Sequence, residues 1–327
     1  MTDFNKRWVN LASAKLGARA VSCSDDFFAP MARMLKDEAP IFIDDKYDDH
    51  GKWMDGWESR RKRIPGNDWC IVKLAKPGVI HGVEIDTTHF TGNYPPAASI
   101  DVCRSADDEP GSDAGWVELV SQSVLDGDSA HQYGVSHSGV FTHVRVNIYP
   151  DGGIARLRVF AEPRVDWEKI KPGERVDIAA ALNGGVALAC NNEHYGSIRY
   201  LLNPGRGVNM GDGWETRRRR EPGNDWVVIA LARSGCIREI EIDTAHYKGN
   251  YPDSCSISGV HLDLLDLAAV ENESERWLEL LPRQKLQADR IHTFTENIID
   301  IGEVTHIRVN IYPDGGLSRI RVMAEVN

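Results

Sequence analysis

Two loops of this chain place a carboxylate beside a row of basic side chains. The motif Trp-Glu-x-Arg-Arg-x-Arg-x-Pro-Gly-Asn-Asp-Trp spans residues 57–69 and returns over 214–226. Guanidinium groups bind carboxylates through paired hydrogen bonds, and a carboxyl side chain can transfer protons. A rigid turn needs the proline, glycine and asparagine, but neither the acid nor the arginines. We therefore predict a chemical role for Glu58 and Arg61, and leave open whether Asp68 does more than bond local backbone.

A second repeated element joins a histidine to a polar loop. His89 and His246 are each followed by the sequence Gly-Asn-Tyr-Pro, at residues 92–95 and 249–252. Each histidine continues the alternation of the strand before it, which predicts a side chain that points into the interior. A lone histidine there is usually a core residue, but loops carry sites on sheet scaffolds. We hypothesise that the histidines handle protons and that Asn93 orients a ligand.

Arginines also alternate along a predicted hairpin. Residues 142–149 and 154–160 alternate apolar and polar side chains around the turn Pro-Asp-Gly-Gly. A hairpin between them would set Arg145 beside Arg158, and like charges placed opposite one another repel. Two solutions stay open at this point. The arginines either pair with strand carboxylates such as Glu84 in a structural network, or they bind an anion.

The repeated motifs belong to a duplicated domain. The copies recur at a distance far longer than the roughly 20–50 residues of solenoid and propeller units. Short alternating segments bounded by Gly, Pro, Asn and Asp predict strands, and their number favours a β-sandwich over alternating strands and helices. We predict an all-β chain of two tandem homologous jelly-roll β-sandwich domains, at residues 1–165 and 174–327, joined by a linker over 166–173.

Charge and composition exclude several classes of protein. A net charge of −11 opposes binding to nucleic acid, which needs a positive face. No run of about eighteen apolar residues is present to span a bilayer, and the opening residues do not resemble a secretory signal. We expect a cytoplasmic protein with no membrane or nucleic-acid partner. The six cysteines have no CxxC spacing, so we predict free thiols. No cluster of histidine and aspartate has the ligand count of a metal site, so we predict no metal.

The motifs together resemble the allantoicase family. The resemblance rests on Ser-Asp-Asp-Phe-Phe-Ala at 24–29, on Asp-Gly-Trp-Glu-Ser-Arg-Arg from residue 55, on the strand and loop of 84–95, and on Asn-Ile-Tyr-Pro-Asp-Gly-Gly at 147–153. It covers nearly the whole chain. It implies two galactose-binding-like jelly rolls and a hydrolase of linear ureido C–N bonds that converts allantoate and water to ureidoglycolate and urea, in purine degradation.

Such a reaction must hold an anion and move protons. The side chains that we expect to do this come from both copies. The expected catalytic residues are Glu58, His89, Glu215 and His246. The expected substrate-binding residues are Arg61, Asp86, Asn93, Arg156, Arg218, Asp243, Asn250 and Arg319. We expect no cofactor, a small-molecule substrate, and self-association into a homo-oligomer. The alternative is a tandem galactose-binding-like carbohydrate-binding or scaffolding module without catalysis.

Overall fold

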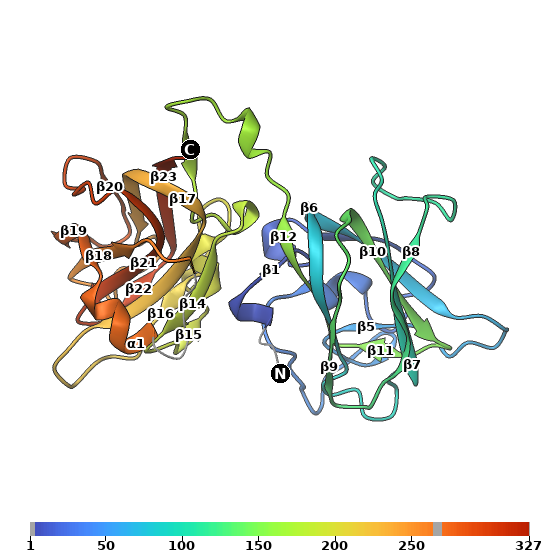
Figure 1. The fold of residues 1–327 in the computed structure, drawn as a ribbon. Helices are drawn as coiled ribbons and strands as arrows, with labels where there is room; N and C mark the ends of the chain where they lie inside the picture. Colours follow the sequence, from blue (N-terminus) through green and yellow to red (C-terminus); the bar gives the residue numbers. More distant parts are fainter. Residues whose placement is uncertain (1–3, 264–269, 327) are drawn as a thin grey trace. The chain divides into compact units, whose positions relative to one another are not determined.

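The chain folds into two compact units that divide between Arg164 and Val165. The computed structural model describes residues 4–263 and 270–326 (Figure 1). We refer to the units as the first and the second repeat and describe each by itself. The all-β prediction with two homologous sandwiches is confirmed, whereas the role of residues 166–173 as a linker stays a prediction. No helix among the described residues is long and apolar enough to cross a membrane.

One long strand organises each repeat. In the first repeat, β6 (Asp68–Asp86) pairs over residues 68–73 with β2 (Arg19–Cys23) and β10 (Val140–Tyr149). Over residues 78–86 it pairs mainly with β12 (Arg156–Pro163) and with β9 (Ala130–Gly134). The strand β6 thus changes neighbours partway along its length. The two groups of strands that it joins form the layers of the sandwich, with a core of apolar side chains between them.

The remaining strands extend the two eight-stranded sheets or form small separate sheets. The first repeat also contains β1 (Val9–Asn10), β3 (Tyr47–Asp48), β4 (Gly51–Lys52), β5 (Trp57–Glu58), β7 (Ala97–Cys103), β8 (Val117–Val124) and β11 (Gly153–Ile154). The second repeat contains β13 (Arg175–Asp177), β14 (Val186–Cys190), β15 (Tyr195–Gly196), β16 (Trp214–Glu215), β17 (Asp225–Asp243), β18 (Ser254–Val260), β19 (Leu278–Lys285), β20 (Ile291–Phe294), β21 (Glu303–Tyr312), β22 (Gly316–Leu317) and β23 (Arg319–Glu325), with one helical turn, α1 (Val270–Glu273).

The predicted alternation is right, but the predicted hairpin pairing is wrong. Val144, Val146 and Ile148 are all fully buried, as expected. However, β10 pairs with β6 and β7, whereas β12 pairs with β6 and β1, so the two strands are not neighbours. Each arginine instead meets a carboxylate.

Arg145 donates to Asp101 at 2.8 Å, and Arg158 donates to Glu84 at 2.8 Å. The structural solution to the arginine pattern therefore holds at these two positions.

The cysteines are free thiols in the structure. Burial raises the pKa of Cys23 to about 11 and that of Cys255 to about 12. At pH 8 a thiol with a pKa near 11 is roughly a hundredfold less ionised than an ordinary cysteine, and the thiolate is the reactive form. We expect iodoacetamide to modify Cys23 and Cys255 of the folded protein far more slowly than in urea. Rapid modification in the folded protein, read by peptide mass, would contradict the partial burial of Cys23 or the full burial of Cys255.

Candidate functional site

Glu58 lies on a short strand at one end of the first sandwich. The strand β5 pairs with β11, where Glu58 is opposite Gly153, and Glu58 also forms a bridge to Ala29. The neighbouring Trp57 is fully buried and donates its indole N–H to the carbonyl of Asp25 at 2.9 Å. The alternation of the strand therefore turns the carboxyl group of Glu58 away from the core and fixes its backbone.

Asn93 meets this carboxyl group from a different loop. Its Nδ2 donates to Oε1 of Glu58 at 2.8 Å. The carbonyl of Asn93 accepts from the N–H of Gly153 at 2.8 Å, which ties the loop to β11. Gly152 has a φ of 138°, and a Cβ there would lie 2.9 Å from the Asn93 carbonyl oxygen. The glycine-rich turn is thus needed for the backbone to approach the loop that holds Asn93.

Two hollows open on this pair. One, of about 550 Å³, is lined by Glu58, Asn93, His89 and aromatic side chains. The other, of about 370 Å³, is lined by Glu58, Asn93, Arg61 and the glycine-rich turn. Because Glu58 and Asn93 line both, we name these hollows together the first-repeat cleft. Burial raises the pKa of Glu58, and the hydrogen bond from Asn93 opposes that shift only in part.

His89 lines the cleft and does not point into the core. The strand β6 ends at Asp86, and His89 then adopts a left-handed backbone with a φ of 68°. Its backbone N–H donates to Asp128 at 2.8 Å, which holds this conformation. The prediction of an interior side chain is therefore wrong, because the alternation stops where the strand stops. The fully buried aromatic ring belongs to Phe90.

The orientation of His89 defines a tautomer. Its Nε2 lies 3.2 Å from the carbonyl oxygen of Pro40. A carbonyl can only accept, so Nε2 carries the proton and Nδ1 of the neutral ring keeps a lone pair. The ring can therefore accept a proton at Nδ1.

Two cationic side chains face the cleft. Arg61 is exposed, and within residues 4–263 and 270–326 its guanidinium has no ion pair or hydrogen bond. Its neighbours in the basic row are engaged, since Arg60 pairs with Asp25 and Lys62 with Asp68. Lys52 lines the other side of the cleft, with its Nζ 4.7 Å from the centroid of the Phe42 ring. Arg61 is thus free to bind a ligand, whereas Asp68 pairs with Lys62 within the loop.

Arg156 and Asp86 lie beneath the site rather than in it. Arg156 is fully buried and donates to Asp55 Oδ2 at 2.6 Å, to the Asp55 carbonyl at 2.7 Å and to the Glu38 carbonyl at 2.9 Å. Asp86 accepts from the N–H of Thr88 at 2.8 Å and is almost fully buried. The alternation of residues 154–160 predicts that Arg156 points outward with the other polar side chains, and this is wrong, because β12 faces the segment around Asp55. Both side chains support the loops that carry the cleft.

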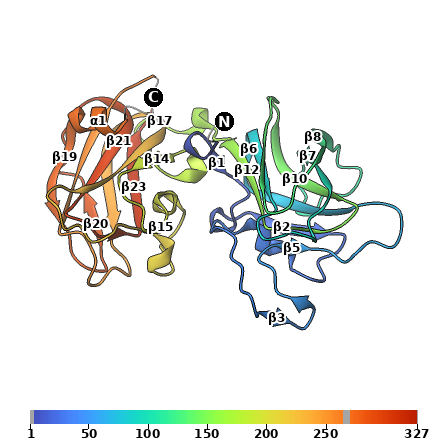
Figure 2. The ribbon, with the colours of Figure 1, turned by 90° about the horizontal axis from the view of Figure 1, so that it is seen from below.

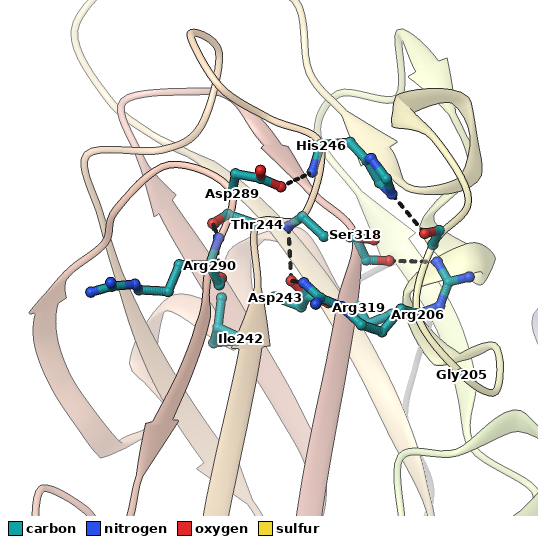
Figure 3. Close-up of polar contacts among 12 residues, drawn as sticks. Gly205, Arg206, Ile242, Asp243, Thr244, His246, Asp289, Arg290, Ser318 and Arg319 are labelled. Atoms are coloured by element: carbon teal, nitrogen blue, oxygen red, sulfur yellow. Dashed lines mark hydrogen bonds and ion pairs between the residues drawn. The ribbon is translucent and has the colours of Figure 1, made fainter.

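The second repeat reproduces this arrangement with changes. Glu215 accepts from Asn250 Nδ2 at 2.5 Å. In Figure 3, Asp289 accepts from the backbone N–H of His246, and the His246 ring reaches toward the segment that carries Gly205 and Arg206. The sulfur of Met210 lies 3.9 Å from Nδ2 of Asn250. The apolar side chain of Met210 therefore lies beside the pair of Glu215 and Asn250. The corresponding pair in the first repeat, Glu58 and Asn93, is open to the cleft.

The remaining predicted residues of the second repeat are divided between scaffold and surface. Arg319 is buried and donates to Asp212, and Asp243 pairs with Arg206 (Figure 3). Arg218 lines a hollow formed by the basic loop itself, together with Asp225, and Glu215 does not line that hollow. This hollow of the second repeat therefore holds the guanidinium of Arg218 without the carboxylate of Glu215.

Sequence reasoning missed several residues of the cleft. Lys52 and His50 come from the hairpin of β3 and β4, which lies at the outer end of a long loop (Figure 2). The acidic sequence of residues 44–49 is typical of a solvated loop, so it gave no signal of a site. Phe28 belongs to a motif that carried the family resemblance, but nothing in its pattern assigned it to a site. Asp128 comes from a loop before β9 and had no signal of its own.

We next consider which side chains could bind a metal ion. Within the described part of the chain, no group of three or more histidine, cysteine, aspartate or glutamate side chains is arranged to hold a metal ion. Among the side chains that line the cleft are the half-buried carboxyl group of Glu58, an amide, an imidazole and two cations. Such a set can bind a small anion and transfer protons.

Comparisons with known proteins agree on one family. The model of the allantoicase repeat matches twice, at residues 9–164 and 176–327. A probable allantoicase 1 of Burkholderia mallei is 56% identical over 98% of this chain and 95% of its own length. A probable allantoicase of Photobacterium profundum is 54% identical over 97% and 96%. The crystal structure of allantoicase from Saccharomyces cerevisiae superposes with a TM-score of 0.82 at 36% identity, over 97% of this chain and 92% of that one. The resemblance inferred from the motifs is confirmed, and this chain belongs to the allantoicase family.

Proposed function

We propose that this protein hydrolyses allantoate to ureidoglycolate and urea, a reaction of purine degradation on linear ureido C–N bonds, and that the first-repeat cleft does the chemistry. Family membership supports the reaction. The observation that carries the site is the hydrogen-bonded pair of Glu58 and Asn93, which opens on the same hollow as the unpaired guanidinium of Arg61.

The chemistry of allantoate assigns a task to each side chain. The substrate carries a carboxylate on a carbon that also bears two ureido groups. Arg61 binds the carboxylate, because a guanidinium matches its two oxygens. The departing ureido nitrogen needs a proton, which Glu58 supplies, because burial favours its neutral form. Nδ1 of His89 accepts a proton from water or from the second ureido N–H. Asn93 positions Glu58 and the leaving group.

The pH dependence follows from the acid role of Glu58. Burial raises its pKa, so the protonated form persists to higher pH than in an ordinary glutamate. As pH rises through this raised pKa, the proton donor is lost, and kcat/KM should fall. We expect this limb of the kcat/KM profile to be absent in Glu58→Gln. A profile of the variant that keeps the same limb would assign the titration to another group.

The direct test of the reaction is urea release from allantoate by the purified full-length protein. The assay is run with and without a chelator, which also determines metal dependence. We expect stoichiometric urea and ureidoglycolate. Binding of galactose without release of urea would instead support the alternative of a carbohydrate-binding or scaffolding module.

We also propose a cytoplasmic homo-oligomer. Support comes from sheet edges such as β8 and β19, which have one strand neighbour each along their sheets and can pair with another chain. Sedimentation analysis of the purified protein tests the proposal. A single species at the mass of one chain would contradict it.

A further inference from the structure

The second repeat contains a hollow with a strongly basic rim. It measures about 540 Å³ and is lined by Asn192, Glu221, Asp225 and the four consecutive arginines of residues 217–220. The hollow lies on the loop of the second repeat that corresponds to the Arg61 loop of the first repeat. Since the chain has a net charge of −11, this concentration of positive charge runs against its general balance.

A single exchange between the repeats releases one of these arginines. In the first repeat Arg60 is neutralised by Asp25, which accepts from its Nε at 2.8 Å and from its backbone N–H at 2.8 Å. The aligned position in the second repeat is Asn192. Its Oδ1 accepts the backbone N–H of Arg217 at 3.0 Å, so the loop is held in the same way. The side chain of Arg217, however, has lost its carboxylate.

The rim therefore carries uncompensated charge. Arg217, Arg218 and Arg220 are exposed, and their guanidinium groups have no hydrogen bond or ion pair within the part of the chain that the structure describes. Arg219 is paired with Asp225 at 2.7 Å, and the carboxylate of Glu221 offsets one further charge. Two positive charges remain in excess, which favours an anion over water at this place.

The floor of the hollow provides an independent observation. Asp225 is 1% exposed, and all of its donors, from Arg219 and Asn191, reach Oδ1. Its Oδ2 is buried and has no hydrogen-bond partner among the residues that the structure describes. An unpaired buried carboxylate oxygen is costly, and a ligand N–H or O–H that entered the hollow would relieve that cost.

We propose that this hollow is a second binding site, outside the catalytic cleft, for a small carboxylate that also carries N–H groups. The arginines of the rim bind the carboxylate, and a ureido N–H donates to Asp225. This combination describes the ureide carboxylates of the proposed reaction, so the inference rests on the proposed function for its ligand class. The site is non-catalytic, because Glu215 lies outside the hollow.

The decisive variant is Asn192→Asp, which restores the carboxylate that the first repeat already uses at this position. We would titrate allantoate into the full-length Glu58→Gln protein by calorimetry at low salt. We expect a binding component that Asn192→Asp weakens at least about tenfold, because the new carboxylate occupies Arg217. The matched control is Arg63→Ala, which removes one exposed arginine from the corresponding loop of the first repeat and should leave this component unchanged.

The outcomes separate the inference from the proposed function. A titration that Asn192→Asp does not alter overturns the second site, as does saturation of the hollow by inorganic phosphate with no competition by allantoate. Urea release by the wild-type protein is measured in parallel. Urea release without the Asn192-dependent binding component supports the proposed function and rules out the second site. The binding component without urea release supports the second site and rules out the proposed function.

Discussion

Glu58→Gln should lower kcat/KM for allantoate by roughly 10²–10⁴, the range typical for loss of a positioned proton donor. Glutamine keeps the shape of the side chain and can still accept the hydrogen bond from Asn93 through its own oxygen. It cannot donate a proton to the leaving nitrogen. The loss should therefore appear in kcat, with KM changed little, because the proposed contact of Arg61 with the carboxylate is kept.

The control for this variant is its stability. Burial raises the pKa of Glu58 in the folded protein above its unfolded value. Stability from such a group is fully present below the unfolded pKa and is lost as pH rises through the folded pKa. At neutral pH, Glu58→Gln should therefore unfold at the same temperature as the wild type or at a higher one. An inactive variant with a clearly lower Tm would attribute the loss of activity to misfolding.

The matched variant in the second repeat is Glu215→Gln. Glu215 has the corresponding amide partner, Asn250, but Met210 lies beside that partner and Arg218 lines a hollow that Glu215 does not line. We expect turnover within about twofold of the wild type. A loss equal to that of Glu58→Gln would show that both repeats carry out the reaction.

Asp55→Asn should destabilise the first repeat by about 3–5 kcal/mol, the usual effect of removing one partner from a buried ion pair. Arg156 is fully buried and its guanidinium depends on Asp55 for both a carboxylate and a carbonyl oxygen. Burial alone would raise the pKa of Asp55, but hydrogen bonds from Lys36 and Arg156 outweigh it, and the pKa is lowered. The carboxylate therefore adds stability above its unfolded pKa, and this stability is lost as pH falls.

Urea denaturation followed by tryptophan fluorescence measures this effect. The control is Lys169→Ala, which removes an exposed ion pair with Asp166 and should change the free energy of unfolding by less than about 1 kcal/mol. A change of similar size in both variants would mean that Arg156 is not held by the pair. If Arg156 instead bound the substrate, Asp55→Asn would raise KM without lowering the free energy of unfolding.

The sequence predicted what repetition and alternation encode. Glu58 and Asn93 are 35 residues apart. Because both copies keep both residues, the sequence assigned them to one site, but it did not predict the hydrogen bond between them. The alternation of residues 142–149 correctly assigned Val144, Val146 and Ile148 to the core. These features depend on local order along the chain, which a single sequence contains.

Features that depend on the partner of a strand could not be predicted. Alternation states which residues share a face, but not that β10 and β12 have different neighbours, so the hairpin and the outward Arg156 were wrong. His89 was misplaced because the end of β6 at Asp86 has no marker in the pattern. Lys52 reaches the cleft from a hairpin with no counterpart that the repeat comparison could identify.

The most direct test of the central claim is a crystal structure of the Glu58→Gln protein with allantoate bound. We predict ligand density in the first-repeat cleft, with the carboxylate on Arg61 and a ureido nitrogen against the side chain at position 58. Density confined to the second repeat, with the first-repeat cleft empty at saturating allantoate, would contradict it.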